Sequence, residues 1–309
     1  MLLNPVRDLD KIQIQTISTC NAKCTICPYA NSWMISNPGK MDRKLFSKIL
    51  MDLEEFKNLK TICLYLMNDP LTDTRIFDLI KETSDHYPNI EIEISTNPLN
   101  LHSSNRRKAL QTLHNKKHCL WISFHGINEG TMKFLMGIPF KICMKNVLDL
   151  LEEDKDQSLN IKIRGTGMSL NNKFFIFSPE QYRGMWQYYL NERGLKSSRY
   201  DIEYFPFHDR AGNLLHERSF LNFNFRRKID PDHPFYCVRF DKVFHVLWDG
   251  TIITCCMDYR QEWDLGNIRD QSIVDYYSSR KYLDFIEVAS GKKEAPKDFI
   301  CARCCSPGG

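Results

Sequence analysis

The sequence predicts an α/β protein built on a parallel sheet. Six short runs that are rich in apolar and β-branched residues have the composition of buried strands. Between these runs lie segments with apolar residues at helical spacing, and this alternation is typical of a parallel sheet with right-handed crossovers. The chain has 309 residues, of which 42% are apolar, so it is long enough for one large domain and a smaller one.

The predicted elements follow one another in order along the first two thirds of the chain. Met41, Leu45 and Ile49 recur at helical spacing, as do Ile76 and Ile80. We expect strands at 12–18, 61–67, 90–95, 119–124, 161–164 and 202–207, and further helices near 106–113, 141–152 and 179–193. Sites on such sheets gather at the carboxyl ends of the strands, so the segments that follow the strands are where we expect functional residues.

Composition and charge limit the classes of function that fit this chain. The net charge is +4, from 42 basic and 38 acidic residues, which is too balanced to indicate a nucleic-acid partner. No run approaches 18 apolar residues and no signal-peptide core is visible, so we expect no membrane association and a cytoplasmic protein. Twelve cysteines without a secretory signal indicate iron–sulfur ligation or buried thiols, not disulfides.

The strongest motif is a CxxxCxxC loop directly after the first predicted strand. Its cysteines are Cys20, Cys24 and Cys27. Three thiolates this close can face one metal cluster, but they cannot occupy all four irons of a 4Fe–4S cluster. One iron would stay open for another ligand. The alternatives are a zinc knuckle or an incidental group of cysteines.

This loop resembles that of the radical S-adenosylmethionine (SAM) enzymes. In that family the open iron chelates the amino and carboxylate groups of SAM, and an electron from the cluster cleaves SAM to a 5′-deoxyadenosyl radical. The family folds as a partial (β/α)6 barrel similar to a TIM barrel, so the resemblance implies this fold for residues 8–225. It also implies SAM and a 4Fe–4S cluster as cofactors, and a flavodoxin- or ferredoxin-type electron donor.

Two turns after later strands resemble SAM-binding turns of the family. Asn68 and Asp69, in the run Leu66–Leu71, stand where the family has a GGE-P-L motif, with Asp69 in place of the glutamate. Ser95 and Asn97 lie in an S-T-N-P sequence that is similar to the family's S-T-N-G turn. The resemblance implies contacts with the amino group and ribose of SAM, whereas the alternative for the first of these segments is a plain turn.

The ends of the fourth and fifth predicted strands carry Ser123 and Arg164. An arginine that ends an apolar strand is costly to leave unpaired, so we expect it to meet an anion. In the family a serine and an arginine at such positions hold the SAM carboxylate. The alternative for Arg164 is a structural ion pair.

The C-terminal part has a second set of cysteines. Asp249-Gly250 between apolar runs predicts a β-hairpin, and a helical stretch is expected over 272–287. The spacing C-x17-C-x45-C-x2-C could bring four thiolates around one cluster; it is formed by Cys237, Cys255, Cys301 and Cys304. This resembles the twitch extension of the SPASM group of radical SAM enzymes, which implies an auxiliary 4Fe–4S cluster in residues 226–309. A structural zinc site with the same ligands is the alternative.

Two cysteines remain beside these proposed ligands, Cys256 and Cys305. Neighbouring residues on a strand point to opposite faces, so Cys256 could face the barrel mouth while Cys255 binds iron. The alternative for Cys256 is a small buried hydrophobic residue. Candidate substrate contacts come from the loops after the fourth and sixth strands, although a lone histidine is more often structural; they are His125, His208, Asp209 and Arg210.

Three function classes fit these features. In an epimerase, the radical removes a hydrogen and Cys256 returns one to the opposite face. In a dehydrogenase, the auxiliary cluster takes the second electron of the substrate radical. The chain resembles the deoxy-scyllo-inosamine dehydrogenase of aminoglycoside biosynthesis in its twitch layout. A binding protein that senses redox state or iron is the third class, and the intact cysteine loop and the SAM-site turns argue against it. We favour epimerisation of a small carbohydrate-like or aminocyclitol natural-product intermediate over peptide modification, because we see no additional N-terminal domain to grip a peptide.

Overall fold

The structure is a computed structural model that describes residues 9–114, 116–167, 169–170, 174–205, 210–214, 228–229 and 237–304. Its strands are β1 (Lys11–Ile14), β2 (Thr61–Cys63), β3 (Glu91–Thr96), β4 (Cys119–Ser123), β5 (Asn160–Gly165), β6 (Ser169–Leu170), β7 (Phe174–Phe175), β8 (Asp201–Tyr204) and β9 (Val243–Val246). Its α-helices are α2 (Arg43–Asp52), α3 (Ile76–His86), α4 (Ser103–Thr112), α5 (Glu129–Met136), α6 (Phe140–Glu153), α7 (Pro179–Glu192), α8 (Val238–Asp241), α9 (Ile273–Ser278), α10 (Arg280–Ala289) and α11 (Ile300–Arg303).

The main sheet is an open barrel of seven parallel strands in the order β8-β5-β4-β3-β2-β1-β9. All six predicted strands are present, so the prediction of a parallel α/β sheet is confirmed. The seventh strand, β9, comes from the C-terminal part and was expected only as one arm of a hairpin. It pairs in parallel with β1, from Lys11 opposite Val243 to Ile14 opposite Val246, and thereby extends the barrel sheet.

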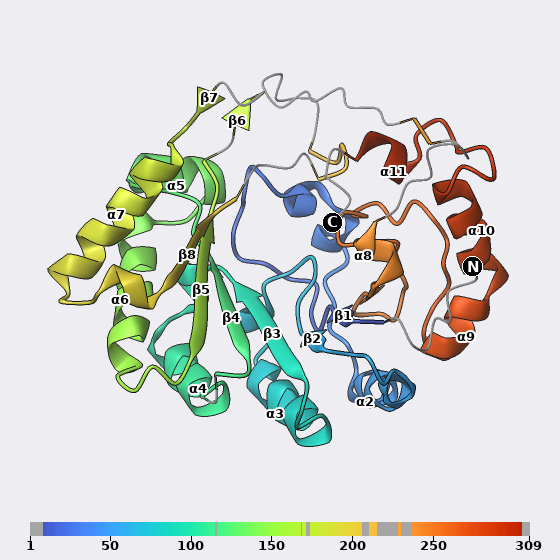
Figure 1. Ribbon diagram of the computed structural model, residues 1–309, viewed down its shortest axis with the longest axis horizontal. Coiled ribbons are helices and arrows are strands. Elements are labelled where there is room, and N and C mark those ends of the chain that lie inside the picture. Colours follow the sequence, from blue (N-terminus) through green and yellow to red (C-terminus); the bar gives the residue numbers. More distant parts are fainter. Residues whose placement is uncertain are drawn as a thin grey trace.

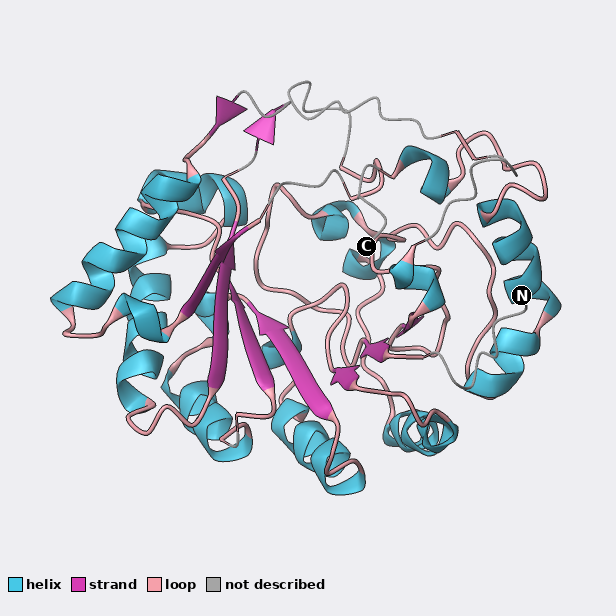
Figure 2. Ribbon diagram, in the orientation of Figure 1, coloured by secondary structure: helices cyan, strands magenta, loops and turns pink. Residues whose placement is uncertain are grey.

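Helices α2, α3, α4, α6 and α7 lie along the outer side of this sheet, as in a (β/α) barrel (Figures 1 and 2). Local sequence fixes their starts: Asp42 accepts a hydrogen bond from the backbone N–H of Leu45 at 2.8 Å, and Ser178 with Gln181 forms a capping box. Their apolar faces pack on the buried core, for example Trp186 of α7 against Phe124, which directly follows β4. The opposite side of the barrel faces the C-terminal segment (Figure 1).

The predicted hairpin turn at Asp249-Gly250 is present. The backbone N–H of Leu247 donates to the carbonyl of Thr251 at 2.9 Å, and Val246 pairs antiparallel with Ile252. Gly250 has φ of 94°, a conformation that favours glycine, which explains its place in the turn. The second arm is short, so the expectation that Cys255 ends a strand is wrong: Cys255 lies in a bend and Cys256 in the turn that follows.

The helical stretch expected over 272–287 is two helices, α9 and α10. Ser279 separates them, because its backbone is extended (φ −71°, ψ 149°) while its side chain accepts from the backbone N–H of Tyr282 and caps α10. The expected domain boundary at 225/226 lies outside the described residues and stays a prediction. Among the described helices, none is long and apolar enough to cross a membrane.

Candidate active site

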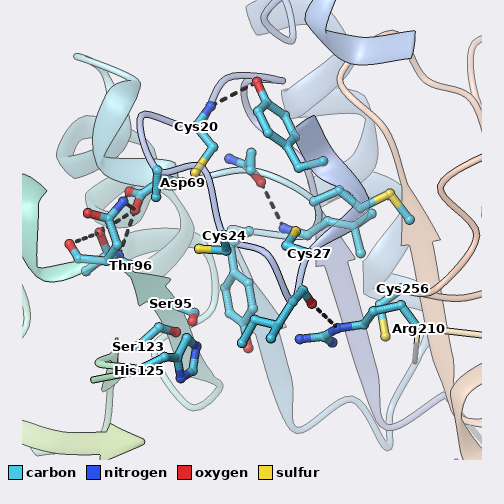
Figure 3. A pocket seen from close by; sticks show the side chains of 18 of the residues that line it. Cys20, Cys24, Cys27, Asp69, Ser95, Thr96, Ser123, His125, Arg210 and Cys256 are labelled. Carbon is cyan, nitrogen blue, oxygen red and sulfur yellow. Dashed lines mark hydrogen bonds between the residues drawn. The ribbon is translucent and has the colours of Figure 1, made fainter. Parts of the chain in front are cut away.

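A cavity of about 440 Å³ lies at the carboxyl ends of the barrel strands. Three parts of the chain form its walls: the CxxxCxxC loop after β1, the turns after β2 to β5, and the C-terminal segment that contains Cys256 (Figure 3). Most of the residues singled out from the sequence therefore meet in one place, at the edge of the sheet where such sites were expected.

The three loop cysteines all line this cavity. Burial raises the pKa of the Cys24 thiol, and the neighbouring Cys27 and Cys20 raise it further, which shows how closely the three thiols are grouped. None is in a disulfide. Cysteine sulfurs are the usual ligands of iron–sulfur clusters, and three of them lie on one wall of the cavity, so this wall fits a metal cluster.

Asp69 is the centre of a dense hydrogen-bond network between the β2 and β3 turns. Its Oδ2 accepts from the backbone N–H of Asn97 at 2.7 Å and from Asn97 Nδ2 at 2.5 Å. Its Oδ1 accepts from the backbone N–H of Leu71 at 3.0 Å and from the Thr96 hydroxyl at 2.8 Å. A carboxylate has about four acceptor sites, so these contacts use nearly all of them. Asp69 lines the cavity but mainly holds its two turns together.

The same network reaches the cysteine loop through Asn21. Asn97 Nδ2 donates to Asn21 Oδ1 at 2.7 Å, and Asn21 Nδ2 donates to Asn100 Oδ1 at 2.6 Å. Cys20 and its neighbours are thus tied to the β3 turn by side-chain amides. Sequence reasoning did not single out Asn21, although its position between two candidate ligands was a usable signal.

Asn68, beside Asp69, presents an unused donor to the cavity. Its Oδ1 accepts from the backbone N–H of Leu66 at 3.0 Å, whereas its buried Nδ2 has no hydrogen-bond partner among the described residues. A buried amide without a partner costs free energy, so this N–H₂ group fits an acceptor on a bound molecule.

Arg164 and two serines form the opposite side of the cavity. Arg164 Nη2 donates to Ser95 Oγ at 3.1 Å, and its guanidinium lies over the Trp121 ring at 4.6 Å. No ion pair of Arg164 occurs in the part of the chain that the structure describes, so the structural ion pair considered above is not observed there. Ser123 lines the same wall. A guanidinium with open donors fits an anionic group such as a carboxylate.

Two of the four candidate substrate contacts line the cavity, His125 and Arg210. Burial, with Arg164 and Arg210 nearby, lowers the pKa of His125 to about 3, so its ring is neutral at physiological pH. Its Nδ1 is buried without a partner in the described structure. Arg210 Nε reaches only the carbonyl of Ile26, at 3.4 Å. The other two, His208 and Asp209, lie outside the described residues.

Among the C-terminal cysteines that the structure describes, one lines the cavity. Cys256 lines the cavity, whereas Cys255 does not. Burial raises the pKa of Cys255, and the nearby Cys256 and Cys301 raise it further, which places Cys301 beside it. Burial would lower the pKa of Arg239, but Cys256, Cys237 and Cys255 raise it, so these thiols surround one guanidinium. Cys256 is therefore close to Cys255 and to Arg239, but of the two cysteines only Cys256 lines the cavity, and it does so from a turn and not from a strand.

The fourth candidate ligand of this set, Cys304, packs against the same hydrophobic core as Cys255 and Cys301, and Cys305 lies outside the described residues. Within the described ranges, no three His, Cys, Asp or Glu side chains converge as ligands of a single metal ion. Each cysteine of a 4Fe–4S cluster binds a different iron, so the ligands of a cluster need not converge on one point.

Several further residues of the cavity were missed from the sequence, among them Glu203, Arg239 and Tyr259. Glu203 lies opposite Arg164 in the β5–β8 register, and a polar residue near the end of a predicted strand was a usable signal. Tyr259 offered no signal, because its position depends on contacts between segments more than 200 residues apart, such as that with Cys27.

The fold and this cavity define an α/β barrel protein with a cysteine loop at the mouth and a cysteine-rich C-terminal extension. A model of the radical SAM superfamily matches residues 14–171, and a model of the SPASM iron–sulfur cluster-binding domain matches residues 237–305. The chain therefore belongs to the radical SAM superfamily and carries a SPASM domain. It is a radical SAM enzyme whose cofactors are SAM and a 4Fe–4S cluster, with further iron–sulfur in the SPASM domain.

Known relatives are distant in sequence but similar in fold. A Pyrococcus furiosus tungsten-containing aldehyde ferredoxin oxidoreductase cofactor-modifying protein is 22% identical, over 89% of this chain and 82% of its own. The structure of BtrN in complex with AdoMet and 2-DOIA has a TM-score of 0.54 and 17% identity, and covers 96% of this chain and 93% of its own. Streptococcus suis SuiB bound to its precursor peptide SuiA has a TM-score of 0.64 and 14% identity, and the match covers 97% of this chain and 76% of SuiB. At these identities the structures support the fold alone.

Proposed function

We propose that this protein is a radical SAM epimerase in which Cys256 returns a hydrogen atom to the substrate. One observation carries the proposal. Cys256 lines the same cavity as the three loop cysteines, whereas its neighbour Cys255, which lies close to Cys301, does not line it. One of two adjacent cysteines is therefore available for chemistry while the other is available as a ligand.

The cavity walls supply each part of the cofactor site in this proposal. Cys20, Cys24 and Cys27 bind three irons of the first cluster. SAM is bound at the turns after the strands, with Arg164 facing its carboxylate. The residues that bind it are Asn68 (through Nδ2), Ser95, Asn97, Ser123 and Arg164. Asp69 keeps the two SAM-binding turns in register. The auxiliary cluster is held by Cys237, Cys255, Cys301 and Cys304, with Arg239 offsetting the negative charge of the thiolates.

SAM and the reduced cluster, held by the loop cysteines and the turns named above, would supply the 5′-deoxyadenosyl radical that removes one hydrogen atom from a substrate carbon. Cys256 then donates the hydrogen atom of its S–H group to that carbon from the opposite side, so the C–H bond forms as the S–H bond breaks. The remaining sulfur radical takes up one electron and one proton to restore the thiol. A flavodoxin- or ferredoxin-type donor supplies that electron and the one that cleaves SAM, so the substrate undergoes no net oxidation.

We infer that the substrate is a small carbohydrate-like or aminocyclitol compound. The cavity of about 440 Å³ must hold SAM as well as the reacting part of the substrate, which favours a small molecule. Neutral His125 can donate or accept a hydrogen bond, and Arg210 has donors directed at the cavity, so both suit hydroxyl groups or an anionic substituent. The structure of SuiB is bound to a precursor peptide, so peptide modification is the alternative to a small-molecule substrate.

The test is substitution of Cys256. Cys256→Ala and Cys256→Ser should still convert SAM to 5′-deoxyadenosine when substrate is present, but should give no inverted product, because neither variant has a weak S–H bond. Cys143→Ala, in helix α6 and away from the cavity, is the matched control and should behave as the wild type. Full activity of Cys256→Ala, with a product lighter by two hydrogens, would establish a dehydrogenase instead.

A further inference from the structure

Tyr259 connects the SPASM domain to the loop that holds the first cluster. Its hydroxyl lies 3.4 Å from the Cys27 sulfur, and its ring packs in a small hydrophobic cluster with Tyr29, Met34 and Met67. This cluster joins the segment after the cysteine loop to the C-terminal hairpin, which contributes Leu247 and Ile253. Tyr259 is buried, so water does not compete for its hydroxyl.

The direction of this hydrogen bond follows from the proposed function, on which this inference rests. Once Cys27 binds iron, its sulfur is a thiolate without a proton, so the tyrosine hydroxyl must be the donor.

The backbone around Tyr259 is held in place by several contacts. Thr254 Oγ1 donates to Asp258 Oδ2 at 3.0 Å, and the backbone N–H of Glu262 donates to Asp258 Oδ1 at 3.0 Å. Asn213 Nδ2 donates to the carbonyl of Met257 at 2.7 Å. The contacts fix the turn that carries both Cys256 and Tyr259, so the hydroxyl is directed at Cys27 by the fold and not by a mobile side chain.

We propose that Tyr259 is a positioning residue of the SPASM domain that raises the reduction potential of the SAM-binding cluster through its hydrogen bond to Cys27. A donor beside a cluster sulfur stabilises negative charge, and the reduced cluster carries one more negative charge than the oxidised one. The bond therefore favours the reduced state, which is the state that cleaves SAM. The C-terminal domain thus affects the reduction potential of the first cluster directly, in addition to binding the auxiliary cluster.

The test is the midpoint potential of each cluster in anaerobically reconstituted full-length protein, followed by electron paramagnetic resonance. The signal that changes when SAM is added identifies the first cluster. In Tyr259→Phe we expect the reduced-to-oxidised ratio of the first cluster to fall about tenfold at a fixed solution potential. This corresponds to a midpoint potential lower by about 59 mV for a one-electron couple. The other cluster, whose signal does not change when SAM is added, should keep its midpoint potential.

Tyr65→Phe is the matched control, since Tyr65 also lines the cavity but its hydroxyl bonds to the carboxylate of Glu93 and not to a sulfur. It should leave both potentials unchanged. A second measurement uses 3-fluorotyrosine at position 259, which keeps the shape of the side chain but is a stronger donor. It should shift the potential of the SAM-sensitive cluster upward, and it serves in place of Tyr259→Phe if that variant does not fold.

An unchanged potential of the SAM-sensitive cluster, or a shift only in the other cluster, would overturn this inference. Either result would leave the cluster assignment intact, because a loaded, SAM-sensitive cluster is required for the measurement. Absence of any SAM-sensitive signal in the wild type would instead contradict the proposed function.

Discussion

The network around Asp69 gives the sharpest prediction for SAM binding. Asp69→Asn replaces one acceptor oxygen by an N–H₂ group of the same size. Oδ1 faces the backbone N–H of Leu71, and Oδ2 faces the backbone N–H of Asn97, so either orientation of the new amide sets a donor against a backbone donor. No rotation of the side chain avoids this conflict.

The cost can be estimated from these contacts. A buried donor left without an acceptor costs about 1–3 kcal/mol, and the lost negative charge weakens the other bonds to this side chain. Because Asn97 also holds Asn21 of the cysteine loop, the strain affects the two turns and the loop that we assign to SAM and its cluster. At about 1.4 kcal/mol for each tenfold change, we expect SAM to bind about 10- to 100-fold more weakly.

The assay is anaerobic titration of SAM into reconstituted protein, with thermal unfolding measured alongside. Asp73→Asn is the matched control, because Asp73 is a buried aspartate on the same loop whose carboxylate pairs with Arg75 at 2.8 Å and does not line the cavity. We expect it to lower stability but to leave SAM affinity within about twofold. Equal SAM affinity in Asp69→Asn and the wild type would refute the reasoning.

Three further predictions address the clusters and the fold. Replacing the three loop cysteines by alanine should abolish formation of 5′-deoxyadenosine under dithionite while iron remains at the auxiliary site; deoxyadenosine from this variant would contradict the assignment. Replacing the four C-terminal candidate ligands by alanine should remove about half of roughly eight irons per chain, on the basis of two clusters of four. Zinc without iron in the variant that lacks the loop cysteines would indicate the structural zinc site. Burial, with Lys117 and His114 nearby, lowers the pKa of His118 from 6.5 to about 4, and its Nδ1 accepts from the backbone N–H of Ile92. Between those values the unfolded chain binds a proton that the folded chain does not. Stability should therefore fall as pH falls from 6.5 to 4, by up to about 3 kcal/mol from this residue, and His118→Gln should reduce the slope of unfolding free energy against pH.

The sequence was sufficient to predict the barrel and the location of the site. Parallel strands alternating with helices place the carboxyl ends of all strands at one edge, so residues such as Asp69, Ser123 and Arg164 could be expected to meet without knowledge of any distance. The cysteine loop after β1 belongs to the same edge for the same reason.

What the sequence could not predict depends on contacts between distant segments. The pairing of β9 with β1 requires the C-terminal part to fold back on the barrel edge, and a four-residue strand carries no signal of its partner. The observed role of Asp69 differs from the expected one for a similar reason. Motif position suggested a direct SAM contact, whereas its oxygens are largely used by Leu71, Thr96 and Asn97.

The direction of Cys256 could be anticipated only in part. Alternation along a strand gave the expectation that Cys255 and Cys256 face different surroundings. In the structure Cys256 lines the cavity and Cys255 does not, and both lie in a bend and turn fixed by the hydrogen bonds of Asp258, which sequence reasoning did not identify. The same segment carries Tyr259, so the proposed roles of Cys256 and of Tyr259 both depend on this one turn.

The most direct measurement of the central claim is the product of wild-type turnover in heavy water. The thiol proton of Cys256 exchanges with solvent, so a hydrogen atom donated by this residue carries deuterium into the substrate. The account predicts a product with inverted configuration at one carbon, a single deuterium at that carbon and a mass one unit higher. A product two mass units lighter with no incorporated deuterium would contradict it.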